Sequence, residues 1–502
     1  MLARCSFFCV GVDAHIDPRE VANSLEISVK SGYFAGTMWA SSPTNLPGDY
    51  REGSFLLLAK KFFRFVQPMH RAVVFCGRGT NEKGGISMKG KQLLAALLAS
   101  ACVLAASGCA AKSASVENLM KDTKKEQTES LYDTTVVQDT ATALTGFGAA
   151  LLQNEMGEAN PLVSPLSVAS ALSMTANGAL GETKTQMEQT LGADTGSLNA
   201  YFSVLQTYLK DNQQMKLANS IWMKDTDTLH IEDTFLQQNA NVFGAGIYSA
   251  PFDDTTKTAI NNWVKENTDG MIPEIIDKIP TDTVMYLVNA LAFDAKWASV
   301  FQSSDVWDGT FIARDGRKQT GAFLHGEVGQ YLHDEHAEGF LKPYEGGRYA
   351  FAALLPEEGT SIEDYVSQLT GEQLHAILTS PGDETVEIAM PKFKSEFSAE
   401  LSDSLQALGM TDAFDGKKAD FTALGTSDEG NICISNVFHK TFLQIDEEGT
   451  KAGAATAVDM TLECAIEYGR SVILDRPFLY MIADLDTGLP VFLGVLTELP
   501  EV

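Results

Sequence analysis

Residues 447–458 have the sequence Glu-Glu-Gly-Thr-Lys-Ala-Gly-Ala-Ala-Thr-Ala-Val, from Glu447 to Val458. From Thr450 to Glu463 the chain alternates with a period of two, which is the pattern of a half-buried strand. The first half of this stretch nevertheless consists of small residues that fill strands poorly and are typical of loops. Such a stretch is suited to change between loop and strand. Its composition alone also fits a small-residue surface loop, so the flanking sequence has to decide.

The flanks favour the first interpretation. An alternating run at 437–446 precedes the stretch, and an apolar run with Arg476-Pro477-Phe478 follows it, before a closing apolar run at 491–496. This arrangement resembles the reactive-centre-loop region of the serpin family. Further similar blocks follow one another in the family's order at 163–172, 289–297, 355–359, 390–393 and 408–414. The resemblance covers the chain from about Asp139 to its end and implies an α+β serpin fold, with helices packed on three β-sheets and an exposed reactive-centre loop.

The resemblance also implies roles for individual residues. The hinge of the loop corresponds to Glu447, Gly449, Thr450, Ala452, Ala454 and Thr456. The shutter, where the middle strands of the main sheet part, corresponds to Ser164, Ser167, Asn289 and His439. The breach at the top of that sheet corresponds to Trp297, Lys392 and Glu447, with an ion pair expected between the last two. His439 is therefore expected to be a buried conformational residue that hydrogen-bonds Asn289, and not a catalytic base.

The function implied is inhibition of serine-type endopeptidases by a suicide-substrate mechanism, in which the cleaved loop inserts into the sheet and traps the acyl-enzyme. Insertion requires small inward-facing residues at the hinge, and the hinge of this chain has them. The alternatives are a non-inhibitory serpin-fold surface binding protein and a cross-class inhibitor of cysteine proteases. The chain has no G-x-S-x-G, H-E-x-x-H, P-loop or C-x-x-C motif, so we expect no enzyme, no cofactor and no metal site.

The position of the bond that the protease attacks is predicted by counting residues from the hinge. The family's count from Gly449 places it between Glu463 and Cys464, with Leu462 and Ile466 as alternates. A carboxylate at the specificity position calls for a basic protease pocket, so a Glu-specific serine protease is the expected partner. The apolar alternates leave a chymotrypsin-like or elastase-like protease open.

The net charge limits the partners further. The chain carries −29, while its first 109 residues hold 12 Lys and Arg against 7 Asp and Glu. The remaining chain is thus strongly acidic and has no basic stripe, which argues against nucleic-acid binding. We expect a monomer.

The N-terminal part is divided into segments by composition. Residues 88–109 have a short basic start, an apolar run and Ala106-Ser107-Gly108-Cys109, which resembles a bacterial lipoprotein signal peptide with its lipobox. Lipidated Cys109 would anchor an extracellular protein to the bacterial cell membrane; an ordinary cleaved signal peptide and a secreted protein are the alternative. Residues 1–87 are expected to be a mis-called upstream extension, with translation starting at Met88. Residues 110–138 are expected to be a polar tether, and 139–502 the serpin domain.

Periodicity predicts the main elements of that domain. Helices are expected at 142–155, 165–178, 183–191, 198–209 and 256–268, and strands from 218, at 284–293 and at 350–355. Ser164 is the expected N-cap of the second helix, with Pro165 at its first position.

Overall fold

The computed structural model describes 115–126, 133–210, 212–280, 283–450 and 469–500, together with the backbone of two short strands near the N-terminus. The chain divides into two units, Met1–Cys109 and Ala110–Val502. In the first unit, β1 (Ser28–Ser31) and β2 (Phe34–Thr37) form an antiparallel pair. The second unit contains all other described elements.

The described helices of the second unit include one in each of the five predicted ranges and four more that the sequence analysis did not predict. They are α4 (Thr134–Glu155), α5 (Pro165–Ala176), α6 (Gly181–Leu191), α7 (Thr195–Leu209), α8 (Asp233–Val242), α9 (Asp254–Asn267), α10 (Ile362–Gln368), α11 (Gly371–Thr379), α12 (Ser402–Ala407) and the 3-10 turns η2 (Ser303–Asp305) and η3 (Asp412–Phe414). Helix α5 is buried along its whole length, and the Ser164 hydroxyl caps it by accepting from the Ser167 backbone N–H at 3.2 Å. Ser164 and Pro165 thus act as the sequence predicts.

The main sheet has the strand order β3-β7-β5-β8-β18-β19-β9, and β16 pairs with the other edge of β18. Its strands are β3 (Glu117–Asn118), β5 (Met215–Lys224), β7 (Gly246–Ala250), β8 (Met285–Phe293), β9 (Ala295–Lys296), β16 (Phe393–Glu400), β18 (Asn436–Ile445) and β19 (Gly449–Thr450). Strands β8 and β18 run parallel, with Tyr286–Leu291 opposite Asn436–Thr441. This parallel ladder is called the seam below.

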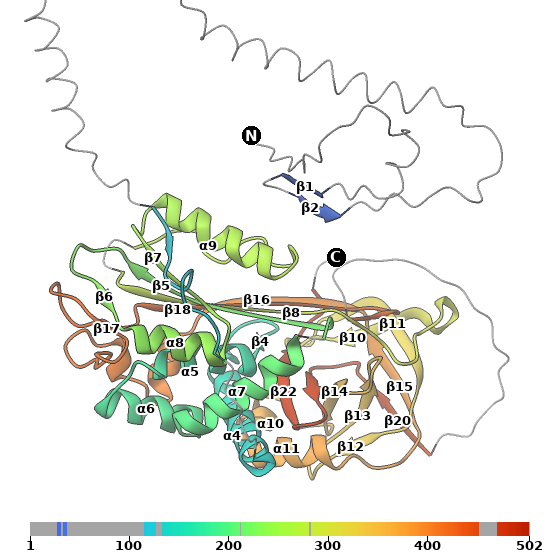
Figure 1. Cartoon of the computed structure of the whole chain (residues 1–502). Helices are drawn as coiled ribbons and strands as arrows, with labels where there is room; N and C mark the ends of the chain where they lie inside the picture. Colours follow the sequence, from blue (N-terminus) through green and yellow to red (C-terminus); the bar gives the residue numbers. More distant parts are fainter. Residues whose placement is uncertain are drawn as a thin grey trace, which may run out of the picture. The chain divides into compact units, whose positions relative to one another are not determined.

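Helices cover both faces of the main sheet. Figure 1 shows α9 along one face and α5 with its neighbouring helices along the other. Ile260 and Val264 of α9 pack against Trp222 and Tyr286, while α5 contributes to the larger core on the opposite face. Because β8 lies between these layers, all nine of its residues are buried, as expected for a central strand covered on both sides.

Two further large sheets complete the unit. The six-stranded sheet has the order β12-β13-β14-β21-β22-β4, and the four-stranded sheet has the order β10-β11-β15-β20. Their strands are β4 (Leu162–Val163), β10 (Val306–Ile312), β11 (Lys318–Val328), β12 (Tyr331–His333), β13 (Ala337–Pro343), β14 (Tyr349–Pro356), β15 (Val386–Pro391), β20 (Arg470–Ile473), β21 (Phe478–Asp484) and β22 (Leu489–Leu496); β6 (His230–Ile231) and β17 (Gly425–Thr426) form a separate pair. The α+β architecture with three large sheets is confirmed. Residues 451–468, where the sequence predicts the loop, lie outside the described residues.

Part of the segment that was expected to be a polar tether, 115–126, is described, and it pairs with the main sheet. Strand β3 adds to the edge of the main sheet by pairing antiparallel with β7, and the Leu119 N–H donates to the Ile247 carbonyl at 2.8 Å. Val116 packs against the apolar cluster beside α9. This apolar residue of an otherwise polar segment therefore helps to hold the segment against the main sheet. Helix α4 also begins earlier than expected, at Thr134, where the Asp133 carboxylate accepts from the Thr135 N–H at 2.9 Å.

Candidate functional site

The hinge segment 446–450 begins with a tight turn after β18. Asp446 Oδ1 accepts from the backbone N–H of Glu448 at 3.0 Å and of Gly449 at 3.2 Å. The chain then reverses into β19, where Thr450 pairs antiparallel with Ile445 of β18 and with Ala295 of β9. The first two residues after the turn therefore already lie between two strands of the main sheet, although the sequence predicts an exposed loop from this point.

Gly449 is required by the closeness of β9. A Cβ atom on this residue would lie 2.1 Å from the Ala295 carbonyl oxygen and 2.7 Å from the Lys296 Cα. Both are backbone atoms within a paired sheet and cannot move aside without breaking the ladder. The need for glycine here arises from this contact and not from a left-handed backbone.

Segment 297–301 holds the hinge from the other side and is called the hinge clamp. Trp297 donates its backbone N–H to the Glu448 carbonyl at 2.8 Å and its indole Nε1–H to the Asp446 carbonyl at 2.9 Å. The Phe301 N–H donates to the Glu447 carbonyl at 3.0 Å. Three consecutive hinge carbonyls are thus bound by two residues of the hinge clamp.

Tyr344 links the hinge clamp to the hinge threonine. Its ring stacks on Trp297, with 4.5 Å between centroids and 11° between planes. Its hydroxyl hydrogen-bonds the hydroxyl of Thr450, which is fully buried. Sequence reasoning missed Tyr344; its place directly after Pro343, at the end of a buried strand, was the available indication.

The predicted ion pair at the breach is present. Lys392 Nζ lies 2.6 Å from Glu447 Oε1, and both side chains are about one-third exposed. Partial burial acts to raise the pKa of Glu447, but the hydrogen bond and charge of Lys392 outweigh it, so this pKa lies below its ordinary value. Solvent screening limits such a pair to ~0–1 kcal/mol.

The four predicted shutter residues also meet, across the seam. His439 and Asn289 lie opposite each other in the parallel ladder, with His439 Nδ1 2.6 Å from Asn289 Oδ1. The Ser164 backbone N–H donates to His439 Nε2 at 3.0 Å, so Nε2 is the acceptor and Nδ1 carries the proton. The Ser167 hydroxyl donates to the same Asn289 oxygen at 3.3 Å, and Asn289 Nδ2 donates to the Phe438 carbonyl at 3.1 Å.

This arrangement suits a neutral imidazole. Complete burial lowers the pKa of His439 to about 3. Each ring nitrogen has a partner, and among the described residues no hydroxyl or thiol is hydrogen-bonded to the ring. The geometry is therefore that of a satisfied polar group spanning two strands and α5, and it provides no general base for hydrolysis.

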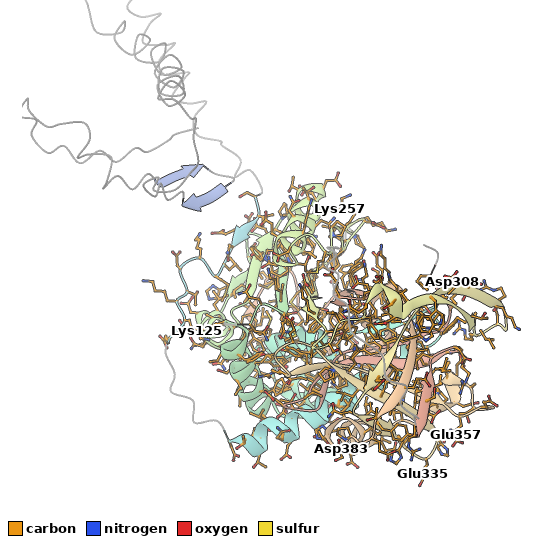
Figure 2. The ribbon with its side chains drawn as sticks, turned by 90° about the vertical axis from the view of Figure 1, so that its right-hand side faces the viewer. Lys125, Lys257, Asp308, Glu335, Glu357 and Asp383 are labelled. Atoms are coloured by element: carbon orange, nitrogen blue, oxygen red, sulfur yellow. The ribbon has the colours of Figure 1, made fainter. Side chains whose placement is uncertain are left out.

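Acidic side chains gather beside β20, the first described strand after residue 468. A cavity of about 540 Å³ is lined by residues that include Glu338, Glu357, Glu358, Asp475 and Ser471 of β20. Figure 2 shows Glu335, Glu357 and Asp383 along the lower side of the second unit in that view, away from Lys125 and Lys257. Arg476, which also lines the cavity, donates to the Pro356 carbonyl at 2.9 Å.

Other site predictions fall outside the described residues. These are Ala452, Ala454, Thr456, Leu462, Glu463, Cys464, Ile466 and Cys109. Within the described part of the chain, no group of His, Cys, Asp or Glu side chains could hold a metal ion. The helices described there include none long and apolar enough to cross a bilayer.

Comparisons with known proteins agree with this geometry. The model of the family "Serpin (serine protease inhibitor)" matches residues 142–499. A serpin-like protein of Thermococcus kodakarensis is 32% identical over 67% of this chain and 80% of its own length. The leukocyte elastase inhibitor of Homo sapiens is also 32% identical, over 67% of this chain and 92% of its own.

Among solved structures, the thermophilic serpin Tengpin in its native state is 40% identical, with a TM-score of 0.72 over 76% of this chain and all of that one. The latent state of Tengpin gives a TM-score of 0.64 over 75% of this chain. The fold described above is therefore nearer to the native arrangement of that relative than to its latent one. The family match spans well over half of the chain, and the chain belongs to the serpin family.

Proposed function

We propose that this serpin is an inhibitor of serine endopeptidases that acts by cleavage and insertion of its reactive-centre loop. The protease attacks the loop and forms an acyl-enzyme. The cleaved loop then enters the main sheet between β8 and β18 before water completes the hydrolysis. Fourteen inserted residues at about 3.3 Å each carry the attached protease ~46 Å. Distortion of its oxyanion hole alone slows deacylation by about a hundredfold or more.

The position of β19 is the observation that carries this proposal. Gly449 and Thr450 already occupy the entry of the seam, antiparallel to the strands on both sides. Each further inserted residue would continue the same ladder toward the shutter. A loop retained only as a passive surface segment would not need a glycine in close backbone contact or a buried threonine bonded to Tyr344.

The shutter and breach are proposed to control when the seam opens. His439, Asn289, Ser164 and Ser167 join its two strands to α5, whereas Lys392 and Glu447 hold its upper end. Residues Ala452, Ala454 and Thr456 are proposed to follow Thr450 inward during insertion. Their small side chains suit burial beneath the sheet.

The target is proposed to be a Glu-specific serine protease that cleaves between Glu463 and Cys464. The acidic surface beside β20 supports a partner with a basic approach surface, because opposite charges raise association rates. Leu462 and Ile466 remain the alternate positions, which a chymotrypsin-like or elastase-like protease would select.

The location is proposed from the N-terminal sequence. Lipidation of Cys109 would anchor the protein to the outer face of a bacterial membrane and present the serpin domain as a monomer. Metabolic labelling with a palmitate analogue tests this, with Cys109→Ala as the matched control. Equal label in both forms would rule out Cys109 as the acceptor and favour the secreted alternative.

The inhibitory function is tested by mixing the full chain with Glu-specific, chymotrypsin-like and elastase-like serine proteases, and with a papain-like cysteine protease. A complex that survives boiling in denaturant and has the summed mass of protease and inhibitor supports the proposal. Protease with a blocked catalytic serine is the control and should give no complex. Complete conversion to cleaved protein with full protease activity would instead indicate a non-inhibitory serpin, and a complex with the cysteine protease alone would indicate the cross-class alternative.

A further inference from the structure

Lys342 is a buried lysine in an otherwise apolar part of β13. Phe340 and Leu341 precede it and Pro343 follows, and its side chain is only 5% exposed. Within the described residues no carboxylate pairs with its ammonium group. Lys342 Nζ instead donates to the Ser299 carbonyl at 2.9 Å and lies 4.2 Å from the centroid of the Phe301 ring and 5.5 Å from that of Trp297.

All three contacts of this ammonium are made with the hinge clamp. Trp297 and Phe301 are also the residues whose backbone N–H groups hold the Glu448 and Glu447 carbonyls. The backbone beside the lysine is tied in as well, because the Ala298 N–H donates to the Pro343 carbonyl at 3.0 Å. Lys342 therefore contacts the hinge clamp, which is the same short segment that binds the hinge.

We propose that Lys342 is a positioning residue that fixes the hinge clamp on the hinge, through its hydrogen bond to Ser299 and its cation–π contacts with Trp297 and Phe301. An ammonium between a carbonyl and two ring faces is attracted to all three, and burial strengthens each attraction. The effect on the hinge contacts follows from geometry alone. The effect on loop insertion rests in addition on the proposed inhibitory function.

The charge of Lys342 is expected to respond to alkaline pH. Burial lowers its pKa to about 8, and no other cause contributes. The neighbouring titratable groups of the breach are Tyr344, Asp446, Glu447 and Lys392, and none of them contributes to this lowering. The group is therefore charged below about pH 8 and neutral above it, so the cation–π contacts weaken as the pH rises through that value.

The experiment is amide hydrogen exchange of Trp297 and Phe301 in the full chain without protease. Lys342→Met keeps the apolar stem and removes the charge, Lys342→Arg keeps a charge at every pH, and Lys394→Met removes a charge from the exposed face of β16. At pH 7 we expect exchange of both amides to rise about tenfold in Lys342→Met. Exchange should change less than about threefold in Lys342→Arg and remain unchanged in Lys394→Met. Unchanged exchange in folded Lys342→Met would overturn the proposal.

The pH profile gives a second test that does not need the methionine variant to fold. Relative to Lys342→Arg at the same pH, exchange in the wild type should accelerate as the pH passes from 7 to 9. If the ratio of the wild-type exchange rate to the Lys342→Arg rate stayed constant from pH 7 to pH 9, the proposal would also be overturned. Complex formation with protease, measured on the same wild-type sample, reports the inhibitory function separately. Absence of a complex with a positive exchange result would reject the function and leave the role of Lys342 standing.

Discussion

Substitution of Thr450 by arginine tests whether the hinge must be buried. The Thr450 side chain is fully buried and bonded to Tyr344. An unpaired guanidinium at this place would cost several kcal/mol. Withdrawal of β19 from the sheet instead breaks the Thr450–Tyr344 bond and the pairing of two residues, which at about 1 kcal/mol per hydrogen bond costs ~2–3 kcal/mol. Withdrawal is the cheaper response, so Thr450→Arg should fold with an extruded hinge and lose only a few degrees of unfolding temperature.

The expected consequence is conversion from inhibitor to substrate. An extruded hinge that carries a guanidinium enters the seam too slowly to compete with deacylation, so the protease completes the cleavage. The assay titrates a susceptible protease and follows residual activity together with covalent complex on a denaturing gel. Thr450→Val is the matched control, because it keeps the size and burial and removes the bond to Tyr344 without adding a charge. It leaves the buried Tyr344 hydroxyl unpaired, which costs about 1–3 kcal/mol of stability, but it should retain inhibition. An unchanged stoichiometry of inhibition in Thr450→Arg would refute the argument that hinge burial drives trapping.

Three further outcomes are expected. Cleavage of the loop should raise the unfolding temperature by roughly 10 °C or more, since an added central strand gains hydrogen bonds on both edges; equal melting of intact and cleaved chains would indicate a non-inhibitory protein. Mass spectrometry of the peptide released by a Glu-specific protease should show Cys464 at its N-terminus, and a peptide that begins at Ala465 or later would exclude Glu463. The pKa of His439 in the folded state is about 3, below its ordinary value, so the stability that its neutral ring contributes is complete above pH 6.5 and declines as the pH falls toward 3. The difference in the free energy of unfolding between wild type and His439→Gln should therefore shrink by at most ~1.4 kcal/mol for each pH unit below 6.5. A difference that stays constant over this range would contradict a buried neutral imidazole.

Much of the fold follows from local patterns that the sequence displays openly. The continuous apolar run of β8 predicts a strand buried on both faces, and Ser164 with Pro165 predicts the start of α5. The meeting of His439, Asn289 and Ser167 was predicted from the family resemblance and not from a local pattern. Nothing in their spacing along the chain would bring together residues more than one hundred positions apart.

The parts that sequence reasoning missed depend on long-range pairing. Strand β3 has only two residues, and it forms because β7 offers a free edge. Helix α4 begins at Thr134 because Val137 and Ala141 are buried against other elements, although the segment is rich in β-branched residues that are weak helix formers. Burial of Thr450 likewise depends on its contacts with β9 and Tyr344. Both lie more than one hundred positions away in the sequence, so local patterns cannot predict these contacts.

The topology of the seam gives a physical reason why the proposed insertion would be favourable and why it would need to be restrained. A strand that enters between β8 and β18 would run antiparallel to both, as β19 already does to β18 and β9. It would replace one parallel ladder by two antiparallel ones, which are slightly more stable per residue. Separation of β8 and β18 by one inserted strand moves them from about 4.8 Å to about 9.6 Å apart. The 2.6 Å contact between His439 and Asn289 cannot survive that movement. Each of these buried groups must then find a new partner in the opened sheet. In the proposed mechanism, the shutter therefore opposes opening until the advancing hinge supplies replacement hydrogen bonds.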